Sequence, residues 1–292
     1  RMGTEQDIAF WLYSSGSNGR PKATPHLQKS LLVAADSYAR NVLNISEQDV
    51  CFSLCKLFVA YGLGNSLTFP LRFGASTVLL SEHASPEKVF ETLEKYKPSV
   101  FFAVPTQYNS MLKKMNDRVV PQFRVCASAG ESLPLDVCRQ WKANTGLDII
   151  DGIGATEALH IFISNQPGDV REGSSGRLVP GYEARIVDED DVDVPEGESG
   201  HLLIRGKSLT PGYWNRPDEN MAKMVEGGWF RTGDLYSQQD GYFTYEGRGD
   251  DMIKVGGLWV SPMEIEYALT EHEAVYECAV VGHDVEGLTK PF

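Results

Sequence analysis

A loop from Tyr13 to Lys22 combines glycines, hydroxyl side chains and a lysine in the order YSSGSNGRPK. Glycines let backbone N–H groups approach a polyphosphate, hydroxyl groups donate further hydrogen bonds, and Lys22 adds a mobile positive charge. The spacing differs from the Walker pattern G-x-x-x-x-G-K-[ST], so the loop predicts another kind of phosphate site, with a plain surface turn as the alternative. The residues expected to hold phosphate are Ser14, Ser15, Gly16, Ser17, Asn18, Gly19 and Lys22.

Three later segments place acidic, hydroxyl and basic residues beside glycines: DGIGATE at 151–157, GWFRTGD at 228–234 and GRGDDMIK at 247–254. Each has a structural alternative when it is taken alone. Thr156 and Glu157 could cap the start of a helix. Asp234 could be a turn aspartate, and Arg248 could belong to a surface ion pair. The ordered occurrence of all four segments favours chemistry over these alternatives.

Together the four segments resemble the core motifs of the adenylate-forming enzymes, which include acyl-CoA synthetases, luciferases and the adenylation domains of peptide synthetases. The resemblance covers essentially the whole chain and is nearest to the benzoate-CoA ligase branch. It implies that an aromatic carboxylic acid, benzoate or a substituted benzoate, is activated with ATP as an acyl-adenylate. Transfer to CoA would then give the aryl-CoA thioester, AMP and pyrophosphate, so ATP, Mg²⁺ and CoA are the implied cofactors.

The resemblance also assigns roles around the nucleotide. Thr156 would contact the α-phosphate and Glu157 would ligate Mg²⁺, because a carboxylate beside a triphosphate is repelled unless a hard cation bridges them. Asp234 matches the residue that accepts hydrogen bonds from both ribose hydroxyls. Arg248 matches a basic residue near the nucleotide at a domain junction. The segments expected around the adenine contain Ala129, Gly130, Glu131, Asp151 and Gly152.

The branch assignment depends on two segments, KLFVAYGLGN at 56–65 and HIFISN at 160–165. Small residues on one side and rigid aromatic or β-branched residues on the other would form a flat apolar slot, which suits a planar acid. A histidine in an apolar run is often simply a core residue, and this is the alternative for His160. The resemblance implies that the slot is lined by Ala60, Tyr61, Ala129, Gly154, His160 and Ile161.

The last part of the chain matches the start of a mobile C-terminal lid. Asp250 matches the hinge at which the lid rotates between an adenylating and a thioester-forming pose. Lys254 and the glycines at 256–257 match the loop that approaches the pantetheine thiol. The thiolate of CoA attacks the acyl-adenylate, so no protein nucleophile is needed and the five cysteines are interpreted as bystanders.

Composition bounds the function further. The 292 residues are 42% hydrophobic and 23% charged, enough for a sizeable core and more than one domain. A net charge of −13 argues against nucleic acid or an anionic membrane as partner. The scattered cysteines suggest neither a disulfide framework nor a zinc site, and no apolar run approaches the roughly 20 residues of a membrane span. We expect a cytoplasmic protein, and a homodimer stays open.

Strand-like and helix-like segments alternate from residue 8 to about 165, which predicts an α/β fold with a mostly parallel sheet and flanking helices. The expected strands are 8–12, 76–80, 100–104, 124–127 and 148–150, and the expected helices are 26–41, 86–96, 106–115 and 134–144. The loops at 14–22, 129–131 and 151–157 should meet at the carboxyl ends of strands.

After residue 175 the pattern changes to short strands and turns, which predicts a small β-barrel-like subdomain. We therefore expect an α/β core at 1–175, a β-rich subdomain at 176–249 and the start of an α+β lid at 250–292, with a helix at 262–269 and a strand at 278–281. The acidic run at 188–191 is expected to be a solvated turn, with a cation site as the alternative.

The chain departs from the family pattern at Ser17, Asn18 and Ala23, where threonine, threonine and glycine are commoner. Family members also carry an N-terminal segment before the first loop and a catalytic lysine near the C-terminus, a role that we do not assign to Lys290. We therefore expect an internal piece that binds nucleotide or aromatic acid more readily than it turns over.

Two other functions stay open. A carrier-loading adenylation domain or luciferase-like enzyme would need a different acyl pocket. A noncatalytic nucleotide- or acid-binding module predicts decay at Lys22, Glu157 or Asp234, and all three are intact.

Overall fold

The computed structural model describes residues 3–14, 21–115, 120, 122–249, 253–255, 258–260, 262–270, 272, 274–275, 278–285 and 288–292. Its largest element is a seven-stranded sheet in the order β4-β3-β5-β6-β7-β8-β9. Pairing is parallel from β4 to β7 and antiparallel from β7 to β9, so the expected mostly parallel sheet is confirmed. The strands are β3 (Val50–Ser53), β4 (Ser76–Val78), β5 (Val100–Ala103), β6 (Val125–Ser128), β7 (Ile149–Gly154), β8 (Ile161–Ser164) and β9 (Arg177–Leu178).

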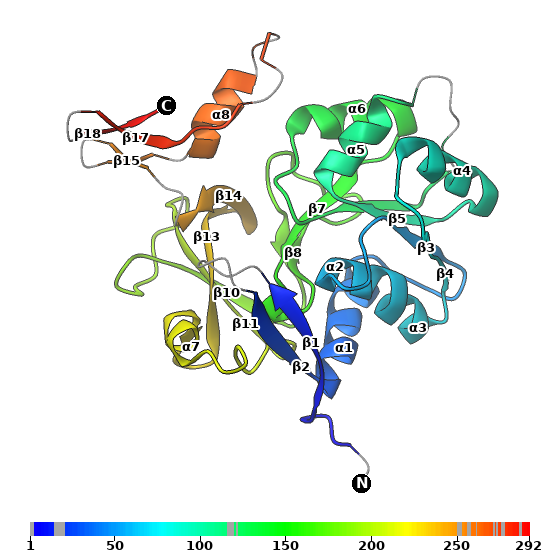
Figure 1. Ribbon diagram of the computed structural model, residues 1–292, viewed down its shortest axis with the longest axis horizontal. Helices are drawn as coiled ribbons and strands as arrows, with labels where there is room; N and C mark the ends of the chain where they lie inside the picture. The colour runs from blue at the N-terminus through cyan, green and yellow to red at the C-terminus, as the bar shows by residue number, and fades with distance from the viewer. Residues whose placement is uncertain are drawn as a thin grey trace.

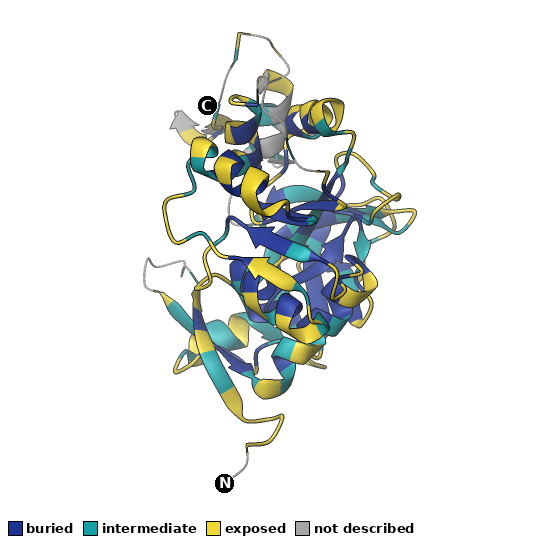
Figure 2. Cartoon of the chain, turned by 90° about the vertical axis from the view of Figure 1, so that its right-hand side faces the viewer, coloured by how far each residue is buried: buried dark blue, intermediate teal, exposed yellow. Residues whose placement is uncertain are grey.

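Two hydrophobic cores cover the two faces of this sheet. Successive side chains of a strand point to opposite faces, and accordingly Phe101 and Phe102 of β5 belong to different cores. The Phe101 core is closed by three helices that Figure 1 shows together beside one face: α4 (Pro86–Tyr96), α5 (Pro105–Leu112) and α6 (Leu135–Thr145). The central strands are buried, while the outer faces of the helices are exposed (Figure 2).

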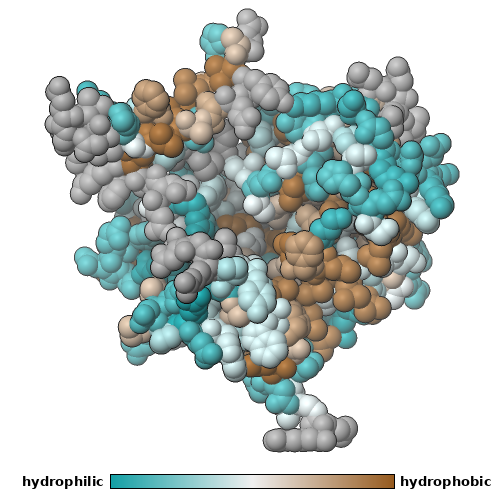
Figure 3. All heavy atoms as spheres, viewed as in Figure 1, coloured by the Kyte–Doolittle hydropathy of each residue, from teal (hydrophilic) through white to brown (hydrophobic). Residues whose placement is uncertain are grey.

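Helical segments before and after β3 contribute Tyr38 and Phe69 to the core that contains Phe102. They are α1 (Gln28–Ala34), the π-helical η1 (Ala35–Arg40), α2 (Ala60–Leu63), π-helical η2 (Gly64–Thr68) and α3 (Phe69–Phe73). Their outward side is partly apolar, with Leu32, Leu67 and Leu71 exposed, and Figure 3 shows a hydrophobic surface in this region.

The first strand differs from the expectation. β1 (Ile8–Ser14) pairs antiparallel with β2 (Lys22–Leu27) in a separate two-stranded sheet, so the expected buried strand of a parallel βαβ unit is wrong. Only Leu12 of β1 is buried, and Trp11 is 45% exposed. Pro25 lacks the N–H that a central strand needs, which fits the edge of a narrow hairpin. The helix expected at 26–41 begins at Gln28 because β2 takes the two residues before it.

A second, antiparallel sheet follows in the order β10-β11-β13-β12, with β14 paired to β13. The bulges between paired strands let this sheet curl, as the expected barrel-like unit requires. Its elements are β10 (Tyr182–Val187), β11 (Gly200–Gly206), α7 (Pro217–Lys223), β12 (Met224–Val225), β13 (Trp229–Gln239) and β14 (Tyr242–Arg248).

The described C-terminal elements are two hairpin-like pairs and one helix, shown in orange and red in Figure 1. They are β15 (Ile253–Val255), β16 (Leu258–Val260), α8 (Pro262–Thr270), β17 (Gly282–Val285) and β18 (Leu288–Pro291). The expected helix at 262–269 is confirmed. The strand expected at 278–281 is wrong, because the ladder between β17 and β18 begins at Gly282.

Candidate functional site

The segment Thr156–Ala158 forms a short 3-10 helix, η3, immediately after β7. Glu157 is only 8% exposed, and its Oε1 accepts hydrogen bonds from the hydroxyls of Tyr213 (2.6 Å) and Ser14 (3.4 Å). His26 in β2 donates from Nε2 to the carbonyl of Thr156 (2.8 Å). Ser14, at the start of the predicted phosphate loop, therefore lies beside Thr156 and Glu157, the residues predicted to contact the α-phosphate and the metal. Ser15, Gly16, Ser17, Asn18 and Gly19 lie outside the described residues.

Lys22, at the other end of the loop, reaches the same place. Its ammonium lies 4.3 Å from the centre of the Tyr213 ring, a cation–π distance. Burial, and after it the charge of Glu157, raises the pKa of Tyr213, so its hydroxyl stays protonated and donates to the carboxylate. The sequence motifs did not indicate Tyr213, which lies outside all four of them.

The surroundings of Glu157 suit a divalent cation. No described Lys, Arg or His forms an ion pair with this buried carboxylate, and burying a charge without a counter-charge is costly. The described residues hold no group of three or more potential protein ligands for a metal. Mg²⁺ usually takes one or two carboxylates together with substrate phosphates and water, so a single glutamate beside a phosphate loop fits it.

Asp234 and Arg248 face each other across β13 and β14. Arg248 Nη1 donates to Asp234 Oδ1 at 2.9 Å, with the aspartate side chain 12% and the arginine side chain 45% exposed. Gly233 has φ +89°, and a Cβ there would lie 2.8 Å from Lys223 Nζ and 3.2 Å from Arg248 Nη2. Thr232, Gly233 and Asp234 lie within β13 and not in a turn, and the positive φ of Gly233 favours glycine at this point of the strand.

The segments expected around adenine are adjacent in the main sheet, because Ser128 at the end of β6 pairs with Asp151 within β7. Ala129 is buried, Gly130 is exposed with φ +92°, and Glu131 accepts hydrogen bonds from the N–H and hydroxyl of Thr106 (both 3.2 Å). Asp151 Oδ1 is buried without a hydrogen-bond partner among the described residues. Burial raises the pKa of Asp151 well above its usual value, which favours the uncharged form of its carboxyl group.

His160 is enclosed by aromatic rings. The ring centres of Phe69, Tyr38 and Tyr61 lie 4.5, 5.3 and 5.4 Å from that of His160. Its Nε2 donates to Asn65 Oδ1 at 3.2 Å, and burial lowers its pKa from 6.5 to about 3. A neutral imidazole among rings would recognise an aromatic acid by shape and not by charge.

The other apolar residues expected in the acid slot are divided between two hydrophobic clusters. Tyr61, Ala129 and Ile161 belong to or pack against one core, whereas Ala60 packs with Leu12 and Leu159. Gly154 and Gly152 have a structural reason to be small: a Cβ would lie 2.8 Å from the His160 carbonyl and 2.7 Å from the Ile163 carbonyl, respectively. Gly64 was missed, although a Cβ there would lie 2.4 Å from His160 Cδ2.

The residues predicted for the lid are described only in part. Asp250, Gly256 and Gly257 lie outside the described residues. The backbone of Lys254 pairs with Trp259 between β15 and β16. A hollow of about 420 Å³ lies between β14 and α8, and Arg248 borders it while none of the expected acid-slot residues does.

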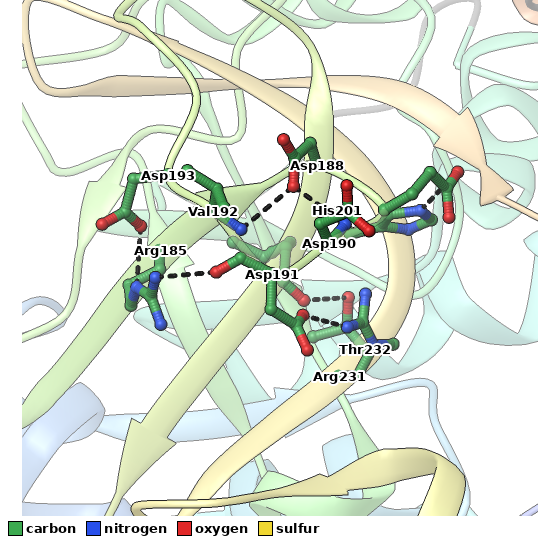
Figure 4. Close-up of polar contacts among 11 residues, drawn as sticks. Arg185, Asp188, Asp190, Asp191, Val192, Asp193, His201, Arg231 and Thr232 are labelled. Atoms are coloured by element: carbon green, nitrogen blue, oxygen red, sulfur yellow. Dashed lines mark hydrogen bonds and ion pairs between the residues drawn. The ribbon is translucent and has the colours of Figure 1, made fainter.

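The acidic run binds protein groups, as Figure 4 shows. Asp188 Oδ1 accepts from the backbone N–H groups of Asp190 and Val192, and Asp191 pairs with Arg231. Asp193 pairs with Arg185 at 2.7 Å, and Glu189 contacts His201 Nε2 at 3.2 Å. These contacts hold the connection between β10 and β11 against the neighbouring strands. They support the interpretation of the acidic run as a turn.

The chain is similar in sequence to curated aryl-CoA ligases. The chain is 51% identical to the benzoate-CoA ligase of Thauera aromatica over 98% of its own length and 55% of that protein. It is 45% identical to a 4-hydroxybenzoate-CoA/benzoate-CoA ligase of Rhodopseudomonas palustris, covering 53% of that protein. The chain thus spans about half the length of the curated relatives it matches.

Two solved structures superpose closely. A benzoate CoA ligase from Burkholderia xenovorans LB400 gives a TM-score of 0.91 at 46% identity, covering 99% of this chain and 58% of that one. The anthranilate CoA ligase AuaEII in complex with anthranoyl-AMP gives 0.92 at 44% identity, covering 98% and 56%. Within the described residues, no helix has the length and apolar character to cross a membrane. Residues 2–214 match the AMP-binding enzyme family, and the chain therefore belongs to that family of adenylate-forming proteins.

Proposed function

We propose that the protein to which this chain belongs is an ATP-dependent aryl-CoA ligase. A carboxylate oxygen of benzoate or a substituted benzoate would attack the α-phosphorus of ATP, releasing pyrophosphate and forming the acyl-adenylate. The thiolate of CoA would then attack the acyl carbon and release AMP. The observation that carries the proposal is the enclosure of His160 by aromatic rings a few residues from Thr156 and Glu157. It supports an aromatic-acid slot beside a phosphate site.

The remaining residues supply binding and charge. Lys22, Ser14 and Thr156 would hold phosphates, and Glu157 would hold a Mg²⁺ that neutralises them. Asp234 would hold the ribose with Arg248 nearby, and Asp151 the adenine. Lys254 would lie in the loop that approaches the CoA thiol in the thioester-forming pose. The five cysteines are unpaired, which favours a cytoplasmic location.

The test uses a stable mimic that joins both halves of the site, an adenosine linked through a sulfamate to a benzoyl group, titrated calorimetrically into this chain. We expect it to bind more tightly than the corresponding hexanoyl compound. His160→Ala should remove that preference, while Tyr108→Phe, at a buried tyrosine of α5, should keep it. Equal affinity for the two compounds in the unchanged chain would refute the aromatic slot, and no binding of either would refute the adenylate site as well.

A further inference from the structure

Residues 208–214 form a connecting segment between the β1–β2 hairpin and the 3-10 helix η3, which carries Thr156 and Glu157. Ser208 Oγ donates to the carbonyl of Ala158 (2.8 Å), and Thr210 N donates to the carbonyl of Glu157 (2.8 Å). On the other side, Thr210 Oγ1 donates to the carbonyl of Pro25 (2.7 Å) and Trp214 N to that of Ala23 (2.9 Å). This connecting segment therefore determines how β2 and η3 face each other.

Tyr213 is the member of the connecting segment whose side chain enters the site, and its backbone is fixed. Its N–H donates to Asn220 Oδ1 (2.7 Å), and Asn220 Nδ2 donates to its carbonyl (3.0 Å). Gly212, with φ +137°, allows the chain to turn against Asn220. The ring is only 3% exposed. A tyrosine held this firmly can orient what it touches.

Tyr213 contacts both Lys22 and Glu157, the two oppositely charged residues of the expected site. The ring carries the Lys22 ammonium on its face, and the hydroxyl holds Oε1 of Glu157 at 2.6 Å. Lys22 and Glu157 contact the same side chain, and without the ring between them the opposite charges would attract each other into a direct ion pair. Such a pair would neutralise both groups before any ligand arrived.

We propose that Tyr213 is a positioning residue: its hydroxyl orients the Glu157 carboxylate toward the Mg²⁺ bound with the nucleotide phosphates, and its ring keeps Lys22 apart from Glu157. The inference rests on the proposed function for the presence of ATP and Mg²⁺. Hydrogen-bond partners of a metal ligand orient it, and their removal typically lowers metal affinity or activity about 10- to 100-fold.

The experiment measures the dissociation constant of ATP by calorimetry, once with Mg²⁺ and once with EDTA, and takes the ratio of the two. Tyr213→Phe keeps the ring and removes the hydroxyl. We expect it to reduce the tightening by Mg²⁺ about tenfold, because the carboxylate loses its orientation. The affinity in EDTA should change by less than about twofold, because the ring still faces Lys22. Tyr108→Phe is the matched control: Tyr108 is also buried, the substitution removes one hydroxyl bond to the Ala127 carbonyl (3.0 Å), and it should leave the ratio unchanged.

A double-mutant cycle shows whether Tyr213 acts through Glu157. Glu157→Gln should also reduce the ratio, and adding Tyr213→Phe to it should reduce the ratio no further. Should Tyr213→Phe not fold, as judged by circular dichroism, Asn220→Ala loosens the same tyrosine and should reduce the ratio to a smaller extent.

The outcomes separate the two hypotheses. A wild-type chain that does not bind ATP refutes the proposed function and the inference with it. A wild-type chain that binds ATP without regard to Mg²⁺ overturns the inference. If the wild type responds to Mg²⁺ and Tyr213→Phe responds equally, or if the two substitutions in the cycle are additive, Tyr213 is not a positioning residue while the proposed function stands.

Discussion

Replacing His160 by glutamine should make the chain less sensitive to mild acid. The imidazole is 3% exposed, and burial lowers its pKa from 6.5 to about 3. Below about pH 6.5, this residue therefore binds a proton in the unfolded chain but stays neutral in the folded chain. The contribution of neutral His160 to stability is complete above that pH and is lost progressively as the pH falls toward the folded pKa.

The magnitude follows from this difference. Between about pH 7.5 and about pH 5.5, the unfolded histidine becomes mostly protonated while the folded one stays neutral, which lowers the free energy of unfolding by about 1.4 kcal/mol. Glutamine can still donate to Asn65 Oδ1 but does not titrate. His160→Gln should be less stable than wild type at neutral pH by about 1 to 3 kcal/mol, because the aromatic packing is disturbed. That deficit should shrink by about 1.4 kcal/mol at the lower pH.

Urea unfolding at the two pH values, followed by tryptophan fluorescence, measures the two differences. Phe162→Leu is the control, since Phe162 lies in β8 two residues after His160, is fully buried and carries no titrating group. Its deficit relative to wild type should not depend on pH. A His160→Gln deficit that stays constant or grows at the lower pH would refute the reasoning that His160 is neutral when folded.

Three further substitutions test other parts of the site. Gly64→Ala places a Cβ 2.4 Å from the His160 ring and should lower the free energy of unfolding by about 1 to 3 kcal/mol in urea titrations. It should also abolish binding of the aromatic acid. Asp151→Asn should raise the free energy of unfolding at neutral pH. Its difference from wild type should grow by up to about 1.4 kcal/mol per pH unit in the same assay, because the raised pKa of Asp151 in the folded chain makes wild-type stability fall as the pH rises. Arg248→Gln should weaken ATP binding a few-fold in calorimetry and make it less dependent on salt, since this exposed cation is screened.

Each of these has a matched comparison. Gly3→Ala adds a methyl group near the exposed N-terminal end, where its nearest neighbour is 3.5 Å away, and should leave stability unchanged. Arg205→Gln removes an exposed arginine paired with Glu183 and should not alter ATP affinity. If the stability advantage of Asp151→Asn shrinks with rising pH, the pKa of Asp151 is not raised in the folded chain. If Gly64→Ala is as stable as Gly3→Ala, there is room for a Cβ beside His160. If the two arginine substitutions change ATP affinity equally, Arg248 has no specific role in nucleotide binding.

Much of the main sheet could be predicted because its signals are local. The helix at 86–96 has a capping serine and an amphipathic pattern, and the structure begins and ends it at the same residues. The first strand could not be predicted as well, because an apolar run from Ile8 to Leu12 indicates a strand without saying what covers it. Its pairing with β2 in a narrow hairpin leaves all but Leu12 at least partly exposed.

The amino-acid sequence by itself determined the chemistry that is available: a glycine- and hydroxyl-rich loop, a Thr-Glu pair, a Thr-Gly-Asp segment and a histidine in an apolar run. Composition and spacing carry this information, because the chemistry depends on residue type and on neighbours along the chain. Only the tertiary structure decided the partners. Tyr213 meets Glu157, and Arg248 meets Asp234, through strand pairing and loop crossings that no local pattern encodes. The low pKa of His160 likewise arises from burial among rings that come from separate elements.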